Sequence, residues 1–169
     1  MQDEIKIAGI VEESIVDGPG IRYVLFTQGC PHHCEGCHNP QTHDFNQGKM
    51  EKIQNIANAI DSNPLLKGIT FSGGEPFMQA KVLSNLIDEV KNKKLDIITY
   101  TGFKFEYLIE NACENNGYMQ LLEKTDILID GKFEINKKDE NLLFRGSSNQ
   151  RAIDVKESLK YGKVIEYEF

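Results

Sequence analysis

One stretch, GITFSGGEPFMQAKVLSNLIDEVKNKKLDIITY (residues 68–100), decides the fold class. It begins with a short apolar run at residues 68–71 and ends with another at residues 95–100, and both runs are typical of buried strands. Between them, residues 79–93 carry apolar side chains at helical spacing: Val82, Leu83, Leu86, Ile87 and Val90. A strand, a helix and a second strand in this order predict a βαβ unit of a parallel sheet.

The same alternation continues on both sides of this stretch. Further strands are predicted at residues 21–27 and 126–129, and helices at residues 51–60, 103–111 and 119–124. We therefore expect an α/β fold with a parallel sheet of about four to six strands. A closed barrel of eight βα units needs about 250 residues, so a chain of 169 residues predicts a partial, open βα barrel. No linker or fixed-period repeat divides the chain, which indicates one domain over residues 1–169.

Composition limits the class of protein. The formal net charge is −7 and the Lys and Arg residues are scattered, which argues against a nucleic-acid partner. No uninterrupted apolar stretch approaches the roughly 18 residues of a membrane helix, and the first residues have no basic region followed by a long apolar one. We expect a cytoplasmic protein without a membrane partner.

Three unusual segments follow predicted strands. Residues 29–40, GCPHHCEGCHNP, follow the strand at 21–27, and residues 72–76, SGGEP, follow the strand at 68–71. Asp130, Gly131 and Lys132 follow the strand at 126–129. In parallel α/β sheets, functional groups gather beyond the carboxyl ends of the strands, so these segments are expected to meet at one end of the sheet.

The first segment contains the pattern C-x3-C-x2-C, formed by Cys30, Cys34 and Cys37. Cytosolic thiols are kept reduced, so a disulfide framework is not expected. Thiolates suit iron-sulfur clusters, zinc or copper(I). A structural zinc site needs a fourth ligand, for which His32, His33 or His38 are candidates. An electron-transfer ferredoxin needs a fourth cysteine, but Cys113 is isolated and is interpreted as a structural residue. Three cysteines on a [4Fe-4S] cubane leave one iron open to a substrate.

Together, these segments carry a resemblance. The cysteine pattern, preceded by DGPGIR (residues 17–22) and followed by SGGEP, resembles the radical S-adenosylmethionine superfamily, and specifically its glycyl-radical activating enzymes. The resemblance implies a [4Fe-4S] cluster on Cys30, Cys34 and Cys37, which are thus the metal-binding and catalytic cysteines of an oxidoreductase. S-adenosylmethionine would bind the open iron and be cleaved reductively to a 5'-deoxyadenosyl radical. Gly36 and His38, on either side of Cys37, would lie against the adenine.

The resemblance also implies further cofactor contacts. Gly73 and Gly74 would let the backbone approach S-adenosylmethionine closely, and the Glu75 carboxylate would accept a hydrogen bond from the methionyl amine. Asp130 and Lys132 match an Asp-x-Lys element in which the lysine pairs with the methionyl carboxylate. Taken alone, the SGGEP segment is a glycine turn and the Asp130–Lys132 segment a surface turn. The implied fold is the partial barrel of the radical S-adenosylmethionine type.

The last third of the chain indicates the target. ILIDGKF (residues 127–133) and LLFRGSSNQR (residues 142–151) resemble the activators of anaerobic (class III) ribonucleoside-triphosphate reductase, and the likeness covers nearly the whole chain. The implied substrate is a glycine of the large reductase subunit, with reduced flavodoxin or ferredoxin as the electron donor. An alternative is an activator of another glycyl-radical enzyme such as pyruvate formate-lyase, where Cys-His-Asn, as at Cys37-His38-Asn39, is frequent. An apolar rim beside the cluster is expected to receive the partner.

Overall fold

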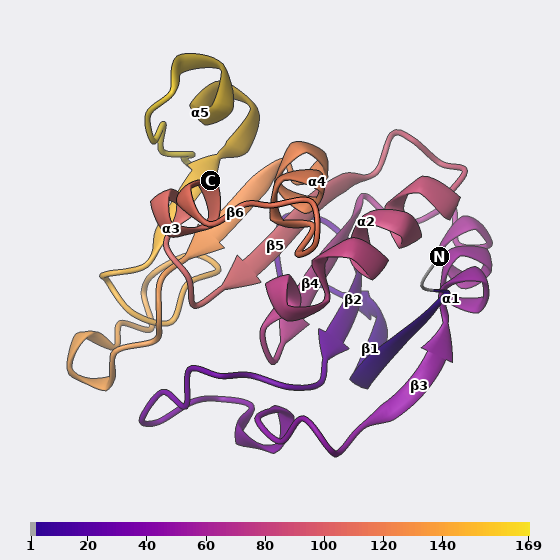
Figure 1. The fold of residues 1–169 in the computed structure, drawn as a ribbon, viewed down its shortest axis with the longest axis horizontal. Coiled ribbons are helices and arrows are strands. Elements are labelled where there is room, and N and C mark those ends of the chain that lie inside the picture. Colours follow the sequence, from indigo (N-terminus) through magenta and orange to yellow (C-terminus); the bar gives the residue numbers. More distant parts are fainter. Residues whose placement is uncertain (1–2) are drawn as a thin grey trace.

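A seven-stranded mixed sheet runs through the centre of the computed structural model, which describes residues 3–169 (Figure 1). Its strand order is β3-β1-β2-β4-β5-β6-β7. The strands span Glu4–Ser14 (β1), Arg22–Thr27 (β2), Lys49–Lys52 (β3), Gly68–Gly73 (β4), Asp96–Thr101 (β5), Ile127–Asp130 (β6) and Arg151–Asp154 (β7). The expectation of four to six strands is therefore wrong.

The middle of the sheet is parallel and its edges are antiparallel. Strand β4 pairs in parallel with β2 and β5, and β5 with β6. Strands β1, β3 and β7 pair antiparallel with their neighbours. The four strands predicted from the sequence are the four parallel ones, so that prediction is confirmed. The prediction that the whole sheet is parallel is wrong, because its outer strands are antiparallel.

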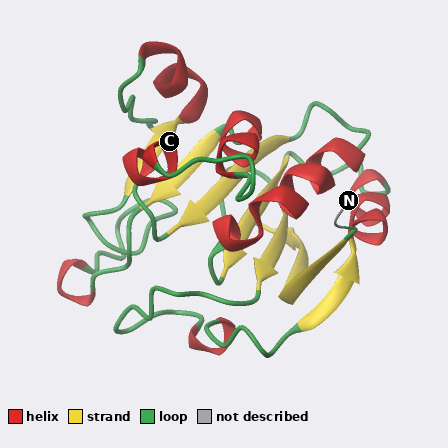
Figure 2. Cartoon of the chain, in the orientation of Figure 1, coloured by secondary structure: helices red, strands yellow, loops and turns green. Residues whose placement is uncertain are grey.

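Helices cover one face of this sheet (Figure 2). They span Ile53–Asp61 (α1), Ala80–Glu89 (α2), Phe105–Glu110 (α3), Tyr118–Lys124 (α4) and Val155–Tyr161 (α5), with short 3-10 turns at Pro40–Thr42 (η1), Pro76–Gln79 (η2) and Ile135–Lys137 (η3). The larger of two buried apolar clusters joins the sheet to the helices, with Leu25, Phe71, Ile97 and Leu128 from strands and Ile56, Leu83, Leu108 and Leu121 from helices. Burial of this apolar surface supplies the main driving force for folding.

Helix α2 ends earlier than its apolar pattern predicts. The pattern continues to residue 93, but Val90 already has an extended conformation, with ψ of 125°. The backbone N–H groups of Lys91 and Asn92 donate to the Asp61 carboxylate at the end of α1, at 3.0 and 3.1 Å. Val90 is buried in the core nevertheless, so its apolar character marks packing rather than helix.

Arg22 lies on the opposite face of the sheet and is fully buried. Its Nε donates to Thr70 Oγ1 at 2.8 Å, and Nη2 donates to the carbonyls of Ile69 at 3.0 Å and Asp96 at 3.2 Å. Its Nη1 lies 2.6 Å from Asp96 Oδ1. One side chain thus ties β2 to β4 and β5.

The helices are all short: within residues 3–169, none is long and apolar enough to cross a membrane.

The carboxyl ends of the four parallel strands point toward one group of loops (Figure 1). The segment after β2, which carries the cysteines, and the segment between β6 and β7 both lie at this end.

Candidate metal centre

A cavity of about 700 Å³ lies at the carboxyl ends of the parallel strands. Cys30, Cys34 and Cys37 all line it. The residues that follow the other strands line it too, among them Gly73, Gly74, Thr101, Gly102, Gly131 and Lys132. The three segments after β2, β4 and β6 therefore meet around one space, as the sequence predicts, and the segment after β5 joins them.

Backbone hydrogen bonds shape the cysteine segment. The N–H groups of Gly29 and Cys30 donate to the carbonyls of Thr42, at 2.7 Å, and His43, at 3.1 Å. Cys37 N–H donates to the carbonyl of Cys34 at 3.2 Å, which closes a turn over residues 34–37. Gly29 has φ of 102°, and a Cβ there would lie 2.4 Å from the Phe45 ring, so only glycine fits before Cys30.

The thiols differ in burial and in their hydrogen-bond donors. Cys30 is 7% exposed, whereas Cys34 and Cys37 are partly exposed. Burial raises the pKa of the Cys30 thiol to about 11, although backbone N–H groups of His32 and His33 lower it in part. Burial also raises the pKa of Cys34, opposed by the N–H of Phe133. These N–H groups are the kind of donor that tunes the sulfurs of an iron-sulfur cluster.

The donor set fits a [4Fe-4S] cluster. Three free thiols line one cavity, and the fourth cysteine, Cys113, is exposed and does not line it. Within residues 3–169, no three or more His, Cys, Asp or Glu side chains converge on a position for one metal ion. A cubane does not require such convergence, because each of its cysteine ligands binds a different iron.

Gly73 and Gly74 pack against the strand that leads to the cysteines. Gly73 has φ of 96°, and a Cβ on it would lie 2.6 Å from the backbone nitrogen of Thr27. A Cβ on Gly74 would lie 2.5 Å from the Gly29 carbonyl oxygen. The sequence predicts a close backbone approach to a cofactor here. The structure adds a second reason for glycine, which is contact between the turn after β4 and the end of β2.

Glu75 does not line the cavity. It is 0% exposed, and its two carboxylate oxygens accept four hydrogen bonds from the chain. Thr101 Oγ1 and Phe77 N–H donate to Oε1, at 2.8 and 3.0 Å. His32 Nε2 and Gly102 N–H lie 2.6 and 2.8 Å from Oε2. In this structure both oxygens of the carboxylate that is expected to accept from a methionyl amine are bonded to groups of the chain.

Asp130 is also buried, 0% exposed, and it too lies outside the cavity lining. Its Oδ1 accepts from Arg151 Nε at 3.0 Å, and its Oδ2 accepts from Arg151 Nη2 at 2.6 Å and from Phe105 N–H at 2.8 Å. Asp130 therefore fastens β7 and the start of α3 to β6. Asp130, which is expected to contact the cofactor, thus has its hydrogen-bond partners within the chain.

The remaining predicted contacts divide between the cavity and its surroundings. His38 and Lys132 line the cavity, and the His38 ring centroid lies 5.1 Å from that of Phe133. Gly36 does not line it. Gly36 has φ of 74°, and a Cβ there would lie 2.8 Å from Ile135 Cδ1, so this glycine lets the cysteine segment pack against η3.

Sequence reasoning missed several residues of the cavity. Tyr100 lines it and donates from its hydroxyl to the Phe144 carbonyl at 2.6 Å. Arg145 lines it as well, and its Nε is buried without a hydrogen-bond partner in the described part of the chain. Arg145 belongs to the RGSSNQ segment that carries part of the family resemblance.

An apolar rim borders the cavity, as predicted. Val11, Val16 and Leu142 line the opening, and Val16 is 73% exposed. Their sequence neighbours Ile15 and Leu143 are 74% and 55% exposed. These five residues are called the apolar rim below. They come from the end of β1 and the loop after it, and from the segment between β6 and β7.

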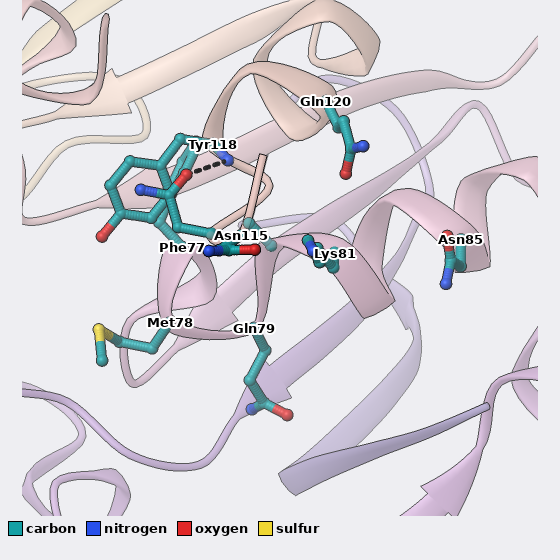
Figure 3. A pocket seen from close by; sticks show the side chains of 10 residues that line it. Phe77, Met78, Gln79, Lys81, Asn85, Asn115, Tyr118 and Gln120 are labelled. Carbon is teal, nitrogen blue, oxygen red and sulfur yellow. Dashed lines mark hydrogen bonds between the residues drawn. The ribbon is translucent and has the colours of Figure 1, made fainter. Parts of the chain in front are cut away.

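A second cavity, of about 640 Å³, lies between η2, the start of α2 and the segment before α4 (Figure 3). Its lining is rich in amide and other polar side chains, including Gln79, Lys81, Asn115 and Gln120. None of the predicted site residues lines it. The predicted site residues that line a cavity therefore line the one that contains the cysteines.

The family match and the relatives of this chain agree with each other. Residues 16–153 match a family described as a 4Fe-4S single cluster domain. Relatives named anaerobic ribonucleoside-triphosphate reductase-activating protein include that of Enterobacteria phage T4, 37% identical over 80% of this chain and 85% of that protein. That of Escherichia coli K12 is 37% identical over 80% of this chain and 90% of that protein.

Among solved structures, QueE from Escherichia coli aligns with 59% of this chain and 52% of its own, at a TM-score of 0.47 and 15% identity. The assignment depends instead on the two relatives, whose identity extends over most of both chains, and on the family match, which spans the cysteine segment and all four parallel strands. The chain belongs to the family of anaerobic ribonucleoside-triphosphate reductase-activating proteins.

Proposed function

We propose that this protein is an oxidoreductase that activates anaerobic ribonucleoside-triphosphate reductase by generating a glycyl radical on the large reductase subunit. One observation carries the proposal: all three cysteines of the C-x3-C-x2-C pattern line a single cavity at the carboxyl ends of the parallel strands. The family relatives, which are named as activators of this reductase, supply the target.

A [4Fe-4S] cluster, when bound, supplies the electron that cleaves S-adenosylmethionine and so starts hydrogen abstraction from the glycine. Cys30, Cys34 and Cys37 would hold it through three irons. Lys132 would pair with the methionyl carboxylate, because an ammonium group is a point charge that binds carboxylates well. His38 would lie against the adenine.

The other predicted residues would contribute from outside the cavity. Gly73 and Gly74 close the gap between the ends of β2 and β4. Glu75 and Asp130 hold neighbouring segments in place through His32 and Arg151. In this proposal the sheet is the partial barrel of the radical S-adenosylmethionine type. Reduced flavodoxin or ferredoxin is the electron donor, and the protein works in the cytoplasm, where thiols stay reduced.

The test is anaerobic reconstitution followed by mixing with S-adenosylmethionine, a strong reductant and the large reductase subunit. We expect roughly four irons per chain, release of methionine and 5'-deoxyadenosine, and the doublet of a glycyl radical by electron paramagnetic resonance. Protein that holds only zinc, or a cluster without cleavage, would contradict the proposal and favour a zinc module or a ferredoxin.

The alternative target, pyruvate formate-lyase, is tested in the same assay. His38 follows Cys37 as in many activators of that enzyme, and this residue is the observation that favours it. Equal amounts of each glycyl-radical protein are supplied to the reconstituted activator. A doublet on formate-lyase and none on the reductase would transfer the function to the alternative.

The apolar rim gives a prediction about the partner. Replacing Ile15 and Leu143, the two rim residues that do not line the cavity, together by aspartate is expected to lower glycyl-radical formation by about tenfold or more, because charged residues are depleted from the buried core of protein interfaces. Cleavage of S-adenosylmethionine without the reductase is expected to stay near the wild-type rate. Both rates are measured on the same reconstituted sample.

Leu65→Asp is the matched control. Leu65 is 63% exposed and does not line the cavity, so this variant adds charge without touching the rim. It is expected to activate the reductase normally. Equal activation by Leu65→Asp and by the double rim variant would remove the rim from the docking surface.

A further inference from the structure

We propose that Glu75 is a positioning residue that holds Cys30 in place through His32, and that it is not a ligand of S-adenosylmethionine. This inference rests on the proposed function only in that Cys30 is taken as a cluster ligand. It assigns to the glutamate of the Gly-Gly-Glu turn a role within the chain, and it makes His32 a second positioning residue of the site.

The turn that contains Glu75 forms hydrogen bonds to the chain on both sides of Cys30. Before the cysteine, Glu75 N–H donates to the Gly29 carbonyl at 2.9 Å, and Gly74 N–H donates to the Thr27 carbonyl at 2.8 Å. After the cysteine, the Glu75 carboxylate binds His32 at 2.6 Å. Main chain and side chain of one residue thus fix the segment 29–32.

Both oxygens of the Glu75 carboxylate are hydrogen-bonded within the chain. Each carboxylate oxygen has two strong acceptor positions, and here each lies within hydrogen-bond distance of two donor groups, from His32, Phe77, Thr101 and Gly102. Glu75 is fully buried, so removal of one donor leaves part of a buried charge without a partner. The network joins the ends of β4 and β5 to the cysteine segment.

The His32 side chain is buried and packs closely against its neighbours. It is 7% exposed, and its ring meets the Phe103 ring edge to face at a centroid distance of 4.6 Å. A Cβ on Gly102 would lie 2.4 Å from His32 Cδ2, so the absence of a side chain at Gly102 makes room for the ring. A surface histidine in a flexible loop would have none of these contacts.

The consequence is that Cys30 is ordered before any cluster is present. Cys30 is 7% exposed, while Cys34 and Cys37 are partly exposed. A ligand that is already held in its final position loses less conformational entropy when the metal binds. Cys30 would therefore be the fixed anchor, and the other two cysteines would adjust to the cluster.

Thiol alkylation of the reduced, cluster-free full chain tests this inference. Iodoacetamide is added anaerobically, and mass spectrometry follows the modification of each cysteine. In the wild-type chain, Cys30 is expected to react at least about tenfold more slowly than the exposed Cys113, because a buried thiol reacts only after local opening. Equal rates for Cys30 and Cys113 would overturn the inference.

Variants then show whether Glu75 acts through His32. His32→Leu removes the donor, and Glu75→Ala removes the acceptor. Each is expected to raise the Cys30 rate by about tenfold, and the double variant should raise it no further than the larger single effect, because both break one interaction. His32→Gln keeps a donor N–H and should restore most of the protection.

Thr125→Val is the control for loss of stability alone. Thr125 is fully buried, and its hydroxyl bonds to Thr99 and to the Leu121 carbonyl at the opposite end of β6. This variant should leave Cys30 protected. Rapid alkylation of Cys30 in Thr125→Val, or full protection in both His32→Leu and Glu75→Ala, would contradict the proposed role.

A direct contact between Glu75 and the methionyl amine predicts a different result. Glu75→Ala would then weaken binding of S-adenosylmethionine to the reconstituted protein while Cys30 stayed protected in the cluster-free chain, and this outcome would overturn the inference. Alkylation needs neither S-adenosylmethionine nor the reductase. Failure of the proposed function is therefore visible separately, as absent cleavage alongside an intact alkylation pattern.

Discussion

Replacing Cys37 by alanine is expected to reduce cleavage of S-adenosylmethionine to the background rate. Cys37 lines the cavity with the other two cysteines, and its Sγ accepts a hydrogen bond from Asn39 N–H at 3.4 Å. Without this thiolate, the cluster would have only two protein ligands, and a cubane held by two thiolates is easily lost. Iron content and methionine release are measured after the same anaerobic reconstitution.

Cys113→Ala is the matched control for this experiment. Cys113 is exposed and lies outside the cavity lining, so its loss should change neither iron content nor cleavage. If Cys37→Ala retains turnover, the three cysteines have no part in the mechanism. If instead Cys113→Ala loses the cluster, the cysteine assignment of the site is wrong.

Arg22→Met is expected to cause the largest loss of stability, about 3–5 kcal/mol in the free energy of unfolding. Arg22 is fully buried and is bonded to three backbone carbonyls, to Thr70 and to the Asp96 carboxylate. Methionine fills a similar volume without donors, so these acceptors lose their partner between β2, β4 and β5. Urea unfolding of the cluster-free chain measures the change.

Lys137→Met provides the comparison with an exposed ion pair. Lys137 Nζ lies 2.7 Å from Glu134 Oε2, and the two side chains are 51% and 47% exposed. Exposed pairs contribute about 0–1 kcal/mol, so this variant should unfold close to the wild-type midpoint. A loss in Arg22→Met no larger than that in Lys137→Met would show that the buried network does not stabilise the sheet.

The centre of the fold could be predicted from sequence, and its edges could not. Strands β2, β4, β5 and β6 are buried on both sides and therefore appear as continuous apolar runs. Strand β3 reads KMEK and is mostly exposed, so no apolar pattern marks it. Strand β7 lies in a polar segment, and its pairing with β6 depends on a distant part of the chain.

The candidate site divides in a similar way. The cysteine pattern is local, and the βαβ order correctly places it beside the turn after β4 and the segment after β6. The roles of Glu75 and Asp130 were harder to predict, because their partners His32 and Arg151 are 43 and 21 residues away along the chain. Only folding reveals that these carboxylates bind side chains of the protein.

The outer strands have a consequence for self-association. Strands β3 and β7 are four residues each, and the free side of β7 is already occupied, since Asp154 N–H donates to Ile165 O and Tyr167 N–H to Ala152 O. Edge strands that are short, charged or covered resist pairing with strands of another molecule. Under the proposed function, a protein that receives another protein's backbone beside its cysteines would thereby avoid polymerising through its own sheet.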